Sequence, residues 1–546
     1  MMPGFNLVDQ PWIPCLLRDG GKPQELSLLD TLTGAHEIRE LSDDSPLVTV
    51  SLHRLLLAIL HRNFGPASFR EWKELWQRGE WDSDKLNRYF DEWKHRFNLF
   101  DKERPFYQVL RMQNAKGKDV DLHPVALLAH EVATGNNATL FDHSFRDAPE
   151  AYSAAVTACY LIAHQAFSLG GGVSHPFNLC HAPLVRGFTV LALGNNLFET
   201  LALNLLIYNK KRPIPQLGKD LPVWEQDSTR QPDKNGTHAQ GYIDYLTWQS
   251  RRLHLIEPEE EASGVLWCKR LQNLRLADER LSLDPFKCYR EDKERGLTPL
   301  PVDPEKALWR DSHTLFQKTD QSKRRPEVFN FLADIEMARR RGEINAQAAY
   351  AFAIYGFATE PPPKSASVRM WARERLPLPL NYLIEPQLVD ELRFALSLAD
   401  DVSATLRESI RALAKLLAAP LSDDRNARQP DPNDVRNIAN SFSAPDFYWA
   451  RLDQPFKKLL TDLPKDFQHK SGDTAQPGDE AMTEWVGTLQ RTARAALENV
   501  VNSLSGSARD LKASAKAEGH FNQQIGRIRK EYAHLFPGEK TAGGEA

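Results

Sequence analysis

One short segment of the sequence carries residue types that bind metals. Residues 174–181 contain His175, Cys180 and His181. Imidazole and thiolate are common zinc ligands, and a catalytic zinc takes three protein ligands and one open position. A fourth ligand, as a closed site needs, is not evident nearby. One hypothesis for the chain is therefore a stand-alone metal-dependent hydrolase that uses these three residues.

The motifs of common nucleotide-binding and hydrolytic enzymes do not occur. The sequence contains no G-x-x-x-x-G-K-[ST], no G-x-G-x-x-G and no G-x-S-x-G. Its paired carboxylates, such as Asp400-Asp401, are expected at helix starts or in loops, where they complement the helix dipole. The sequence thus nominates no catalytic residue. We expect a protein that is not an enzyme and uses no cofactor.

A run of three glycines, Gly170-Gly171-Gly172, directly follows an apolar segment. One glycine is enough to end a helix, because it accepts the left-handed backbone conformation of a C-terminal cap. Three in a row also allow a partner to approach the backbone very closely. A nucleic-acid groove would suit such a loop, and a helix cap is the alternative.

Positive charge is gathered into clusters, although the formal net charge of the chain is -4. An acidic chain has no overall attraction for nucleic acid, so any binding must come from local patches. Segregated lysines and arginines are the usual footprint of phosphate contacts. The clusters are Lys210-Lys211-Arg212, Lys323-Arg324-Arg325, Arg339-Arg340-Arg341, Lys364 with Arg369, Arg373 and Arg375, and a C-terminal set between Arg491 and Lys530.

The 546-residue chain has an ordinary globular composition, 41% hydrophobic and 26% charged, which excludes collagen-like and wholly disordered proteins. Its five cysteines form no C-x-x-C pair, which argues against a disulfide scaffold. With no secretory signal visible, a reducing cytoplasm is the expected location. Residues 151–185 contain no Asp, Glu, Lys or Arg. We interpret them as a buried helix and loop, not a membrane span, because they hold several histidines and glycines.

Spacing and turn residues predict a mixed but mainly helical N-terminal domain over residues 1–385. Residues 12–27 are typical of a β-hairpin with Gly20-Gly21 in its turn. Leucines and isoleucines between 52 and 60 recur in steps of three and four, which predicts a helix. Residues 209–241 are expected to form a loop. Helices on both sides of the prolines at 361–363, 377 and 379 are expected to stop there.

The remaining residues, 386–546, are expected to form a four-helix bundle. Four apolar stripes with helical spacing run over residues 402–417, 449–459, 486–504 and 525–535. Loops are expected at 420–434 and 464–478. The predicted fold class is therefore α+β and predominantly helical: a large mixed α/β domain with small sheets, followed by a four-helix bundle.

Several segments in the same order resemble one known family. They are the opening residues 5–14 (FNLVDQPWIP), 103–108 (ERPFYQ), 136–143 (NNATLFDH), 169–172 (LGGG) and 245–252 (YLTWQSRR). Together they resemble the CasA large subunit of the type I-E CRISPR Cascade surveillance complex. The resemblance covers most of the first 380 residues, and the C-terminal part fits in pattern only.

The resemblance implies a non-catalytic, RNA-guided role in antiviral defence. Such a subunit recognises the protospacer-adjacent motif, binds double-stranded target DNA during R-loop formation, and helps recruit a helicase-nuclease. Its partners would be the other Cascade subunits, the guide RNA and the target DNA. Base pairing with the guide would read most of the sequence, and protein would read the flanking motif.

The resemblance also implies DNA- and motif-binding residues. Three elements supply them: a loop near the flanking motif, the glycine loop, and a cationic finger after Asp284-Pro285, for which Lys287, Arg290 and Lys293 stay as alternatives. A strand-separating wedge corresponds to residues 358–365, where this sequence has prolines and no glutamine. The candidate residues are Asn137, Phe141, Asp142, His143, Gly170, Gly171, Gly172, Arg290, Lys293 and Lys364.

Overall fold

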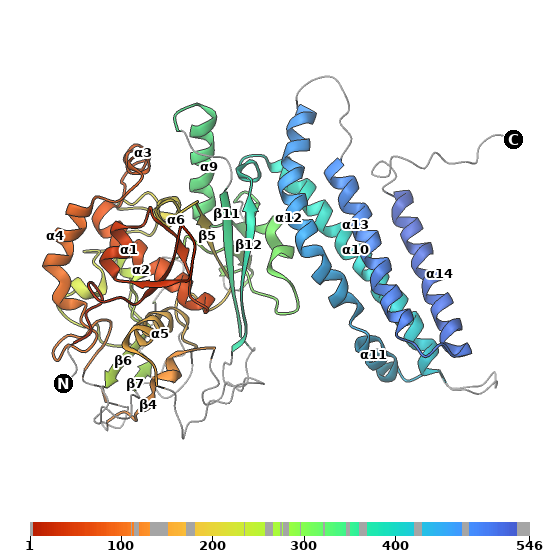
Figure 1. Ribbon diagram of the computed structural model, residues 1–546, viewed down its shortest axis with the longest axis horizontal. Coiled ribbons are helices and arrows are strands. Elements are labelled where there is room, and N and C mark those ends of the chain that lie inside the picture. The colour runs from red at the N-terminus through yellow and green to blue at the C-terminus, as the bar shows by residue number, and fades with distance from the viewer. Residues whose placement is uncertain are drawn as a thin grey trace. The chain divides into compact units, whose positions relative to one another are not determined.

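The computed structural model divides the chain into two compact units, Met1–Leu376 and Pro377–Ala546 (Figure 1). The division falls ahead of the position expected from the sequence. The structure describes residues 4–110, 112–113, 119–131, 151–170, 181–233, 235–256, 266–272, 276, 283–294, 296–319, 323–344, 350–359, 368–419, 429–471 and 480–531.

The N-terminal hairpin is confirmed. Strand β1 (Ile13–Leu17) pairs antiparallel with β2 (Gln24–Leu26), and Ile13 lies opposite Leu26. Gly20 and Gly21 in the turn have φ of 85° and 100°, which favours glycine. Strand β3 (Ile38–Leu41) joins the other edge of β1, so the sheet order is β2-β1-β3.

Helices form most of this unit, and α2 (Pro46–Phe64) lies at its centre with nearly every residue buried. It begins at Ser45, whose side chain accepts the Val48 N–H, and Pro46 occupies the first turn. Helix α5 (Ala154–Phe167) packs on α2 and confirms the buried helix expected there. The other helices are α1 (Leu28–Thr33), α3 (Phe69–Arg78), α4 (Ser83–Trp93), α6 (Leu197–Asn204), α7 (Tyr242–Leu246), α8 (Ser312–Phe316) and α9 (Glu327–Arg340).

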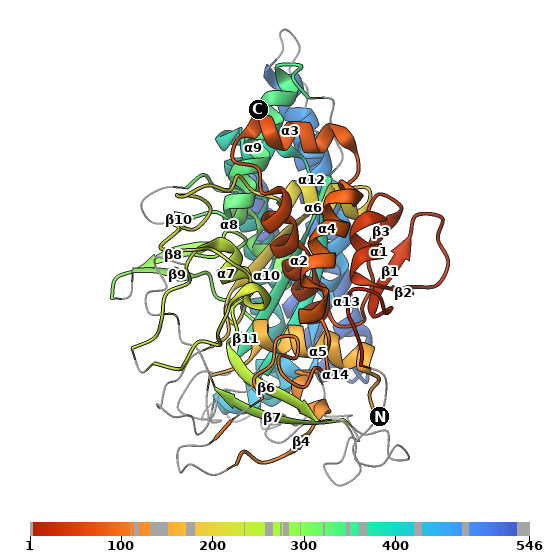
Figure 2. The same ribbon diagram turned by 90° about the vertical axis from the view of Figure 1, so that its left-hand side faces the viewer.

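Three further small sheets complete the unit. One has the order β4-β7-β6, with β4 (His123–Pro124), β6 (Arg251–Ile256) and β7 (Trp267–Gln272). It lies beside α5 in both ribbon views (Figure 2). A second has the order β10-β8-β9, with β8 (Tyr289–Asp292), β9 (Gly296–Pro299) and β10 (Lys323–Arg324). Short 3-10 turns include η1 (Lys94–Arg96), η2 (Val125–Leu128) and η3 (Val223–Glu225).

The prediction of helices around the proline cluster is wrong. The flanking elements are strands β11 (Tyr350–Thr359) and β12 (Val368–Leu378), in a sheet of order β12-β11-β5 with β5 (Phe188–Leu193). Strand β11 is rich in aromatic residues and almost wholly buried, as suits a central strand. Pro377 lies within β12, an edge strand, where a missing N–H is tolerated.

The C-terminal unit is a helical bundle, as expected. Its long helices are α10 (Pro386–Ala418), α12 (Ala444–Ser471), α13 (Glu480–Asn502) and α14 (Ala508–Glu531), and α11 (Pro432–Ser441) is short. Helix α10 contacts the other four. The buried faces include Leu406, Phe456 and Leu489, each from a stripe recognised in the sequence. Most predicted core positions of the first three stripes are therefore confirmed. In the fourth stripe Ile525 is buried, and Tyr532 and Leu535 lie outside the described residues.

A loop was expected to start at Pro464, but α12 continues through Pro455 and Pro464 to Ser471. A proline inside a helix removes one backbone hydrogen bond and costs about 3 kcal/mol. Leu459, Leu460 and Leu463 are buried on the same helix, and α12 packs along α13. Burial of that face holds the helix together across the proline.

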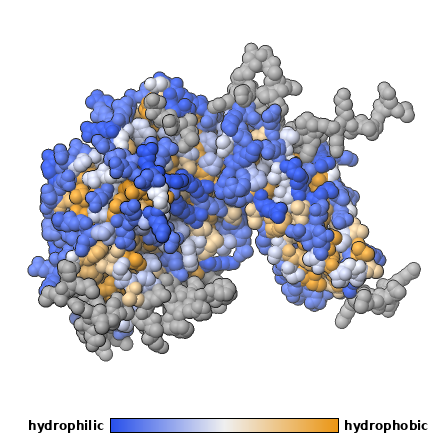
Figure 3. All heavy atoms as spheres, in the orientation of Figure 1, coloured by the Kyte–Doolittle hydropathy of each residue, from blue (hydrophilic) through white to orange (hydrophobic). Residues whose placement is uncertain are grey.

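Hydrophilic side chains cover most of the visible face of each unit, with smaller apolar groups between them (Figure 3). Among the described residues, the large exposed hydrophobic side chains are Leu122, Leu217, Met337 and Leu511, which come from four separate segments. No helix in the described ranges combines the length and apolar character that crossing a bilayer requires. The cysteines at 15, 159, 268 and 288 are buried and free of disulfides.

Candidate nucleic-acid interface

The two ends of the glycine loop are tied together where the structure describes them. Helix α5 ends at Phe167, and the chain returns at His181. The Gly170 N–H donates to His181 Nδ1 at 3.0 Å, and the Ala182 N–H donates to the Ser168 carbonyl at 2.9 Å. The loop therefore starts and ends at one fixed point. Gly171 and Gly172 lie outside the described residues.

Arg251, at the start of β6, forms hydrogen bonds with the residues at the end of α5. It is 1% exposed, and its guanidinium donates to the carbonyls of Ser168 and Leu169 at 3.0 and 2.6 Å. Its backbone also exchanges two hydrogen bonds, both 2.9 Å, with the Gln165 amide. These bonds fix the two residues that directly follow α5 and join its last turn to β6. Arg251 belongs to the 245–252 segment that carries the family resemblance.

Neutral histidines surround this anchor. The rings of His130 and His164 stack with centroids 5.1 Å apart. His164 donates from Nδ1 to the Leu128 carbonyl, so its Nε2 accepts from Arg270. Burial is the main cause that lowers the pKa of His164 well below its usual value, and Arg270 adds to it. The imidazole can therefore accept a hydrogen bond from a cation at neutral pH.

His181 is also held neutral. Burial lowers its pKa to about 4, with further lowering by Arg186, Arg251 and Lys287. Its Nδ1 must stay unprotonated to accept the Gly170 N–H. This role differs from metal ligation by His175, Cys180 and His181, of which His175 and Cys180 lie outside the described residues. Within the described ranges, no group of three or more potential metal ligands comes together.

The three alternatives for a cationic finger have different environments. Lys287 is 3% exposed, and its Nζ donates to the carbonyls of Pro183 and Arg186 at 2.6 and 2.9 Å. It thus secures the segment that returns from the glycine loop. Arg290, in β8, and Lys293, in the β8–β9 turn, are exposed. Of the three, Arg290 and Lys293 are the ones that reach solvent.

Replacing Lys287 by methionine is expected to lower the free energy of unfolding by about 2 kcal/mol, because two buried carbonyls lose a charged donor. Arg290→Met and Lys293→Met serve as controls and should each change it by less than about 0.5 kcal/mol, because both side chains are exposed. Urea unfolding of the three variants measures the difference. Equal stability of all three would contradict the anchoring role of Lys287.

The segment 103–108 has a structural part in the same unit. Gln108 is buried; its Nε2 donates to the Leu99 carbonyl at 2.7 Å and its Oε1 accepts the Leu255 N–H at 2.7 Å. The Val109 N–H donates to the Leu253 carbonyl. The segment is therefore fastened to β6, the strand that also carries Arg251.

Arginines in several of the basic clusters form ion pairs with carboxylates. Arg339 and Arg340 both pair with Glu336 on α9. Arg373 and Arg375 both lie within 3.5 Å of Glu40, and Arg369 pairs with Glu305. Arg325 is buried and donates to Asn330. These clusters thus present less positive surface than their sequence suggests, because carboxylates pair with them: Glu336 from the same helix, and Glu40 and Glu305 from distant segments. Lys210 and Lys211 are exposed.

The remaining candidate residues cannot be placed. Asn137, Phe141, Asp142, His143 and Lys364 lie outside the described residues. Of the proposed wedge at 358–365, residues 358 and 359 end β11 and the others lie outside the described residues. Sequence reasoning missed Gln165 and Lys287 as supports of the glycine loop. The signal was weak: both are polar residues in otherwise apolar surroundings, such as Lys287 between Phe286 and Cys288.

The comparisons with known proteins agree with this arrangement. The family model described as CRISPR-associated protein Cse1 matches residues 6–496. The chain belongs to the Cse1 (CasA) family. The match covers most of the first unit and continues into the second as far as residue 496, within α13. It thus includes part of the bundle, for which the sequence offered a pattern and no motif. The resemblance recognised in the sequence is thus confirmed.

Individual Cse1-family relatives match over almost the whole chain. The CasA/Cse1 protein of Thermus thermophilus is 29% identical over 540 residues, covering 96% of this chain and 98% of its own. A crystal structure of CasA from Thermus thermophilus has a TM-score of 0.76 at 26% identity, covering 96% of this chain and 100% of its own. A chain of a CRISPR RNA-guided surveillance complex has a TM-score of 0.71 at 21% identity, with 96% and 100% covered. These matches confirm the predicted fold class.

Proposed function

We propose that this chain is the large subunit of a CRISPR Cascade RNA-guided surveillance complex. In that complex it recognises the protospacer-adjacent motif, binds double-stranded target DNA during R-loop formation, and helps recruit a helicase-nuclease. Membership of the Cse1 family carries the proposal. Its partners are the other subunits, the guide RNA and the target. The chain has no catalytic role of its own and acts in the cytoplasm.

The tied ends of the glycine loop support this role. Hydrogen bonds of Gly170, His181, Arg251 and Lys287 hold the described ends of the segment that contains residues 171–180. The glycines at 170–172 have no side chains, so they can bring backbone N–H and C=O groups against the floor of a minor groove, where only a degenerate pattern can be read. Motif reading through such a loop would be permissive.

The test is Gly171→Asp in the assembled complex. The added carboxylate should keep the backbone away from base edges and repel phosphates, so we expect affinity for correct targets to fall about tenfold. Discrimination against wrong motifs should shrink with it. Gly519→Asp, at an exposed position of α14 with open space around it and no positive φ, is the matched control. Binding is measured at two salt concentrations, and thermal melts accompany it.

A folded and assembled Gly171→Asp variant that binds correct and incorrect targets like the parent would contradict the proposal. The second candidate, a metal-dependent hydrolase, has no supporting observation in the described ranges. Stoichiometric zinc in the purified chain, lost in a His175→Ala variant, would favour it instead.

A further inference from the structure

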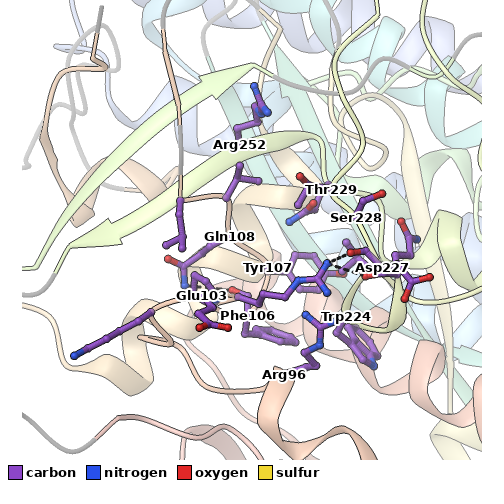
Figure 4. A pocket seen from close by; sticks show the side chains of 18 of the residues that line it. Arg96, Glu103, Phe106, Tyr107, Gln108, Trp224, Asp227, Ser228, Thr229 and Arg252 are labelled. Atoms are coloured by element: carbon purple, nitrogen blue, oxygen red, sulfur yellow. Dashed lines mark hydrogen bonds between the residues drawn. The ribbon is translucent and has the colours of Figure 1, made fainter.

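A groove of about 660 Å³ opens on the Met1–Leu376 unit. Its lining does not include Gly170, His181, Arg251 or Lys287, which tie the glycine loop. Its walls come from the end of η1, the segment 102–110, the residues from η3 to Gln231, and the start of β6. Figure 4 shows the lining side chains converging from these elements. The groove has the volume of a small-molecule pocket, roughly 300–1,000 Å³, so it can admit one or two nucleotides and excludes a duplex.

Cationic side chains outnumber carboxylates on the walls of the groove. Arg96, Lys102, Arg104 and Arg252 line it, against Glu103 and Asp227, both of which are exposed. Arg104 donates to the carbonyls of Gln226 and Asp227. The groove therefore offers positive charge along walls that are themselves well ordered by hydrogen bonds.

Two of the arginines lack a carboxylate partner. Among the described residues, Arg96 makes no hydrogen bond or ion pair; its pKa is lowered by burial first and by Arg104 next, with a smaller opposing effect from Asp227 and Asp101. Arg252 donates to Gln231 Oε1 at 3.1 Å, whereas its buried Nε has no partner. Burial lowers the pKa of Arg252. An anion in the groove would stabilise both cations.

The placement of the charges indicates the shape of that anion. Arg252 and Arg96 lie on opposite sides of the groove, with Tyr107 and Gln108 between them (Figure 4). Charges separated in this way match an anion whose charges repeat along its length. The walls between them carry amide and hydroxyl groups, from Gln226, Ser228, Thr229 and Gln231. Tyr107 and Trp224 also line the groove, but they are 6% and 4% exposed, so little of either ring reaches it. Amide and hydroxyl groups can hydrogen-bond base edges.

We propose that this groove binds a short stretch of single-stranded nucleic acid, with its phosphodiesters against Arg96 and Arg252. The amide and hydroxyl lining beside the separated arginines favours a nucleic-acid strand over an acidic peptide, because a strand offers base edges as well as charge. The site is separate from the glycine loop, and its occupancy does not depend on the reading of a flanking motif. The strand can be RNA or DNA, since both share the phosphodiester chemistry.

The experiment uses the full chain and two fluorescein-labelled 12-nucleotide probes of one mixed sequence, one RNA and one DNA. We expect Arg96→Gln/Arg252→Gln to weaken binding at low salt about tenfold and to reduce the salt slope by about two, one for each lost phosphate contact. Arg70→Gln/Arg88→Gln, with the same charge change on exposed helix faces, should bind as the parent does. The charge-preserving Arg96→Lys/Arg252→Lys should retain most of the affinity.

The outcomes distinguish RNA from DNA as the bound strand, and nucleic acid from an acidic polypeptide as the ligand. Preference for the RNA probe assigns the groove to guide RNA, and preference for the DNA probe assigns it to a target strand. The proposal is overturned if the parent binds neither probe at low salt, if the control loses as much affinity as the groove variant, or if polyglutamate displaces the probes as well as unlabelled oligonucleotide does. A groove variant that fails to melt cooperatively is replaced by the lysine variant, whose loss of all binding would also overturn it.

Discussion

Replacing Arg54 by methionine is expected to lower the free energy of unfolding by about 3–5 kcal/mol, because it leaves a buried carboxylate without its cation. Arg54 lies on α2 and is 8% exposed. Its Nη1 is 3.0 Å from Asp284 Oδ2, and the guanidinium lies over the Tyr245 ring at 4.6 Å. It also donates to the carbonyls of Tyr245 and Leu246. One side chain therefore joins α2, α7 and the residue before Pro285.

Loss of Arg54 should also destabilise the segment that carries Arg290, a candidate DNA-binding residue. Asp284 also accepts the Tyr245 hydroxyl at 3.1 Å and the Phe286 N–H at 2.9 Å, so it anchors the segment that leads to Lys287 and then to Arg290. Loss of Arg54 should increase amide hydrogen exchange in β8 and β9 more than in the C-terminal bundle.

Urea unfolding measures the stability change, and Arg393→Met is the control. Arg393 pairs with Asp390 in an exposed i,i+3 arrangement and should contribute less than about 1 kcal/mol. An Arg54→Met/Asp284→Asn double variant should lose less than the sum of the single variants, because each single change leaves an unpaired group. Additive losses, or a loss no larger than that of the control, would rule out a coupled buried pair.

The second large effect is expected at Arg251. Arg251→Met should lower the free energy of unfolding by about 3 kcal/mol, because the carbonyls of Ser168 and Leu169 lose a charged donor at the end of α5. If the glycine loop reads the flanking motif, the assembled complex should also bind correct targets about tenfold more weakly, since a misplaced loop loses contacts that require close approach.

Lys269→Met on the neighbouring strand β7 is the matched control. Lys269 pairs with Asp119, which is 80% exposed, so its loss should cost less than about 1 kcal/mol and leave target binding unchanged. Thermal melts and binding to correct and incorrect targets are measured on the same preparations. Unchanged motif discrimination in a folded Arg251→Met complex would show that Arg251 does not position the glycine loop for recognition of the flanking motif.

Local patterns in the sequence were sufficient to predict several helices and strands. Helix α2 follows from the apolar periodicity of residues 52–60, the hairpin from its paired glycines, and the long bundle helices from their stripes. These features depend on neighbours within a few residues, where periodicity and turn chemistry act directly. The collinear motifs likewise identified the family before any contact was known.

Predictions from local sequence were wrong where packing against distant residues stabilises the observed element. The prolines near 361–379 suggested helix ends, yet the flanking segments are strands because aromatic β11 is buried at the centre of a sheet. Pro464 suggested a loop, yet packing of α12 on α13 carries the helix through it. In both cases the burial of a long apolar face outweighed a local preference of a few kcal/mol.

The sequence by itself determined the family, the α+β class and the bundle, because these depend on motif order and apolar period. The tertiary structure decided which charges are available. Glu40 folds onto Arg373 and Arg375, and Lys287 turns inward to carbonyls, whereas Arg96 and Arg252 meet no carboxylate partner in the described ranges. The reason is that pairing and burial depend on contacts between segments far apart in the chain, and residue spacing does not encode them.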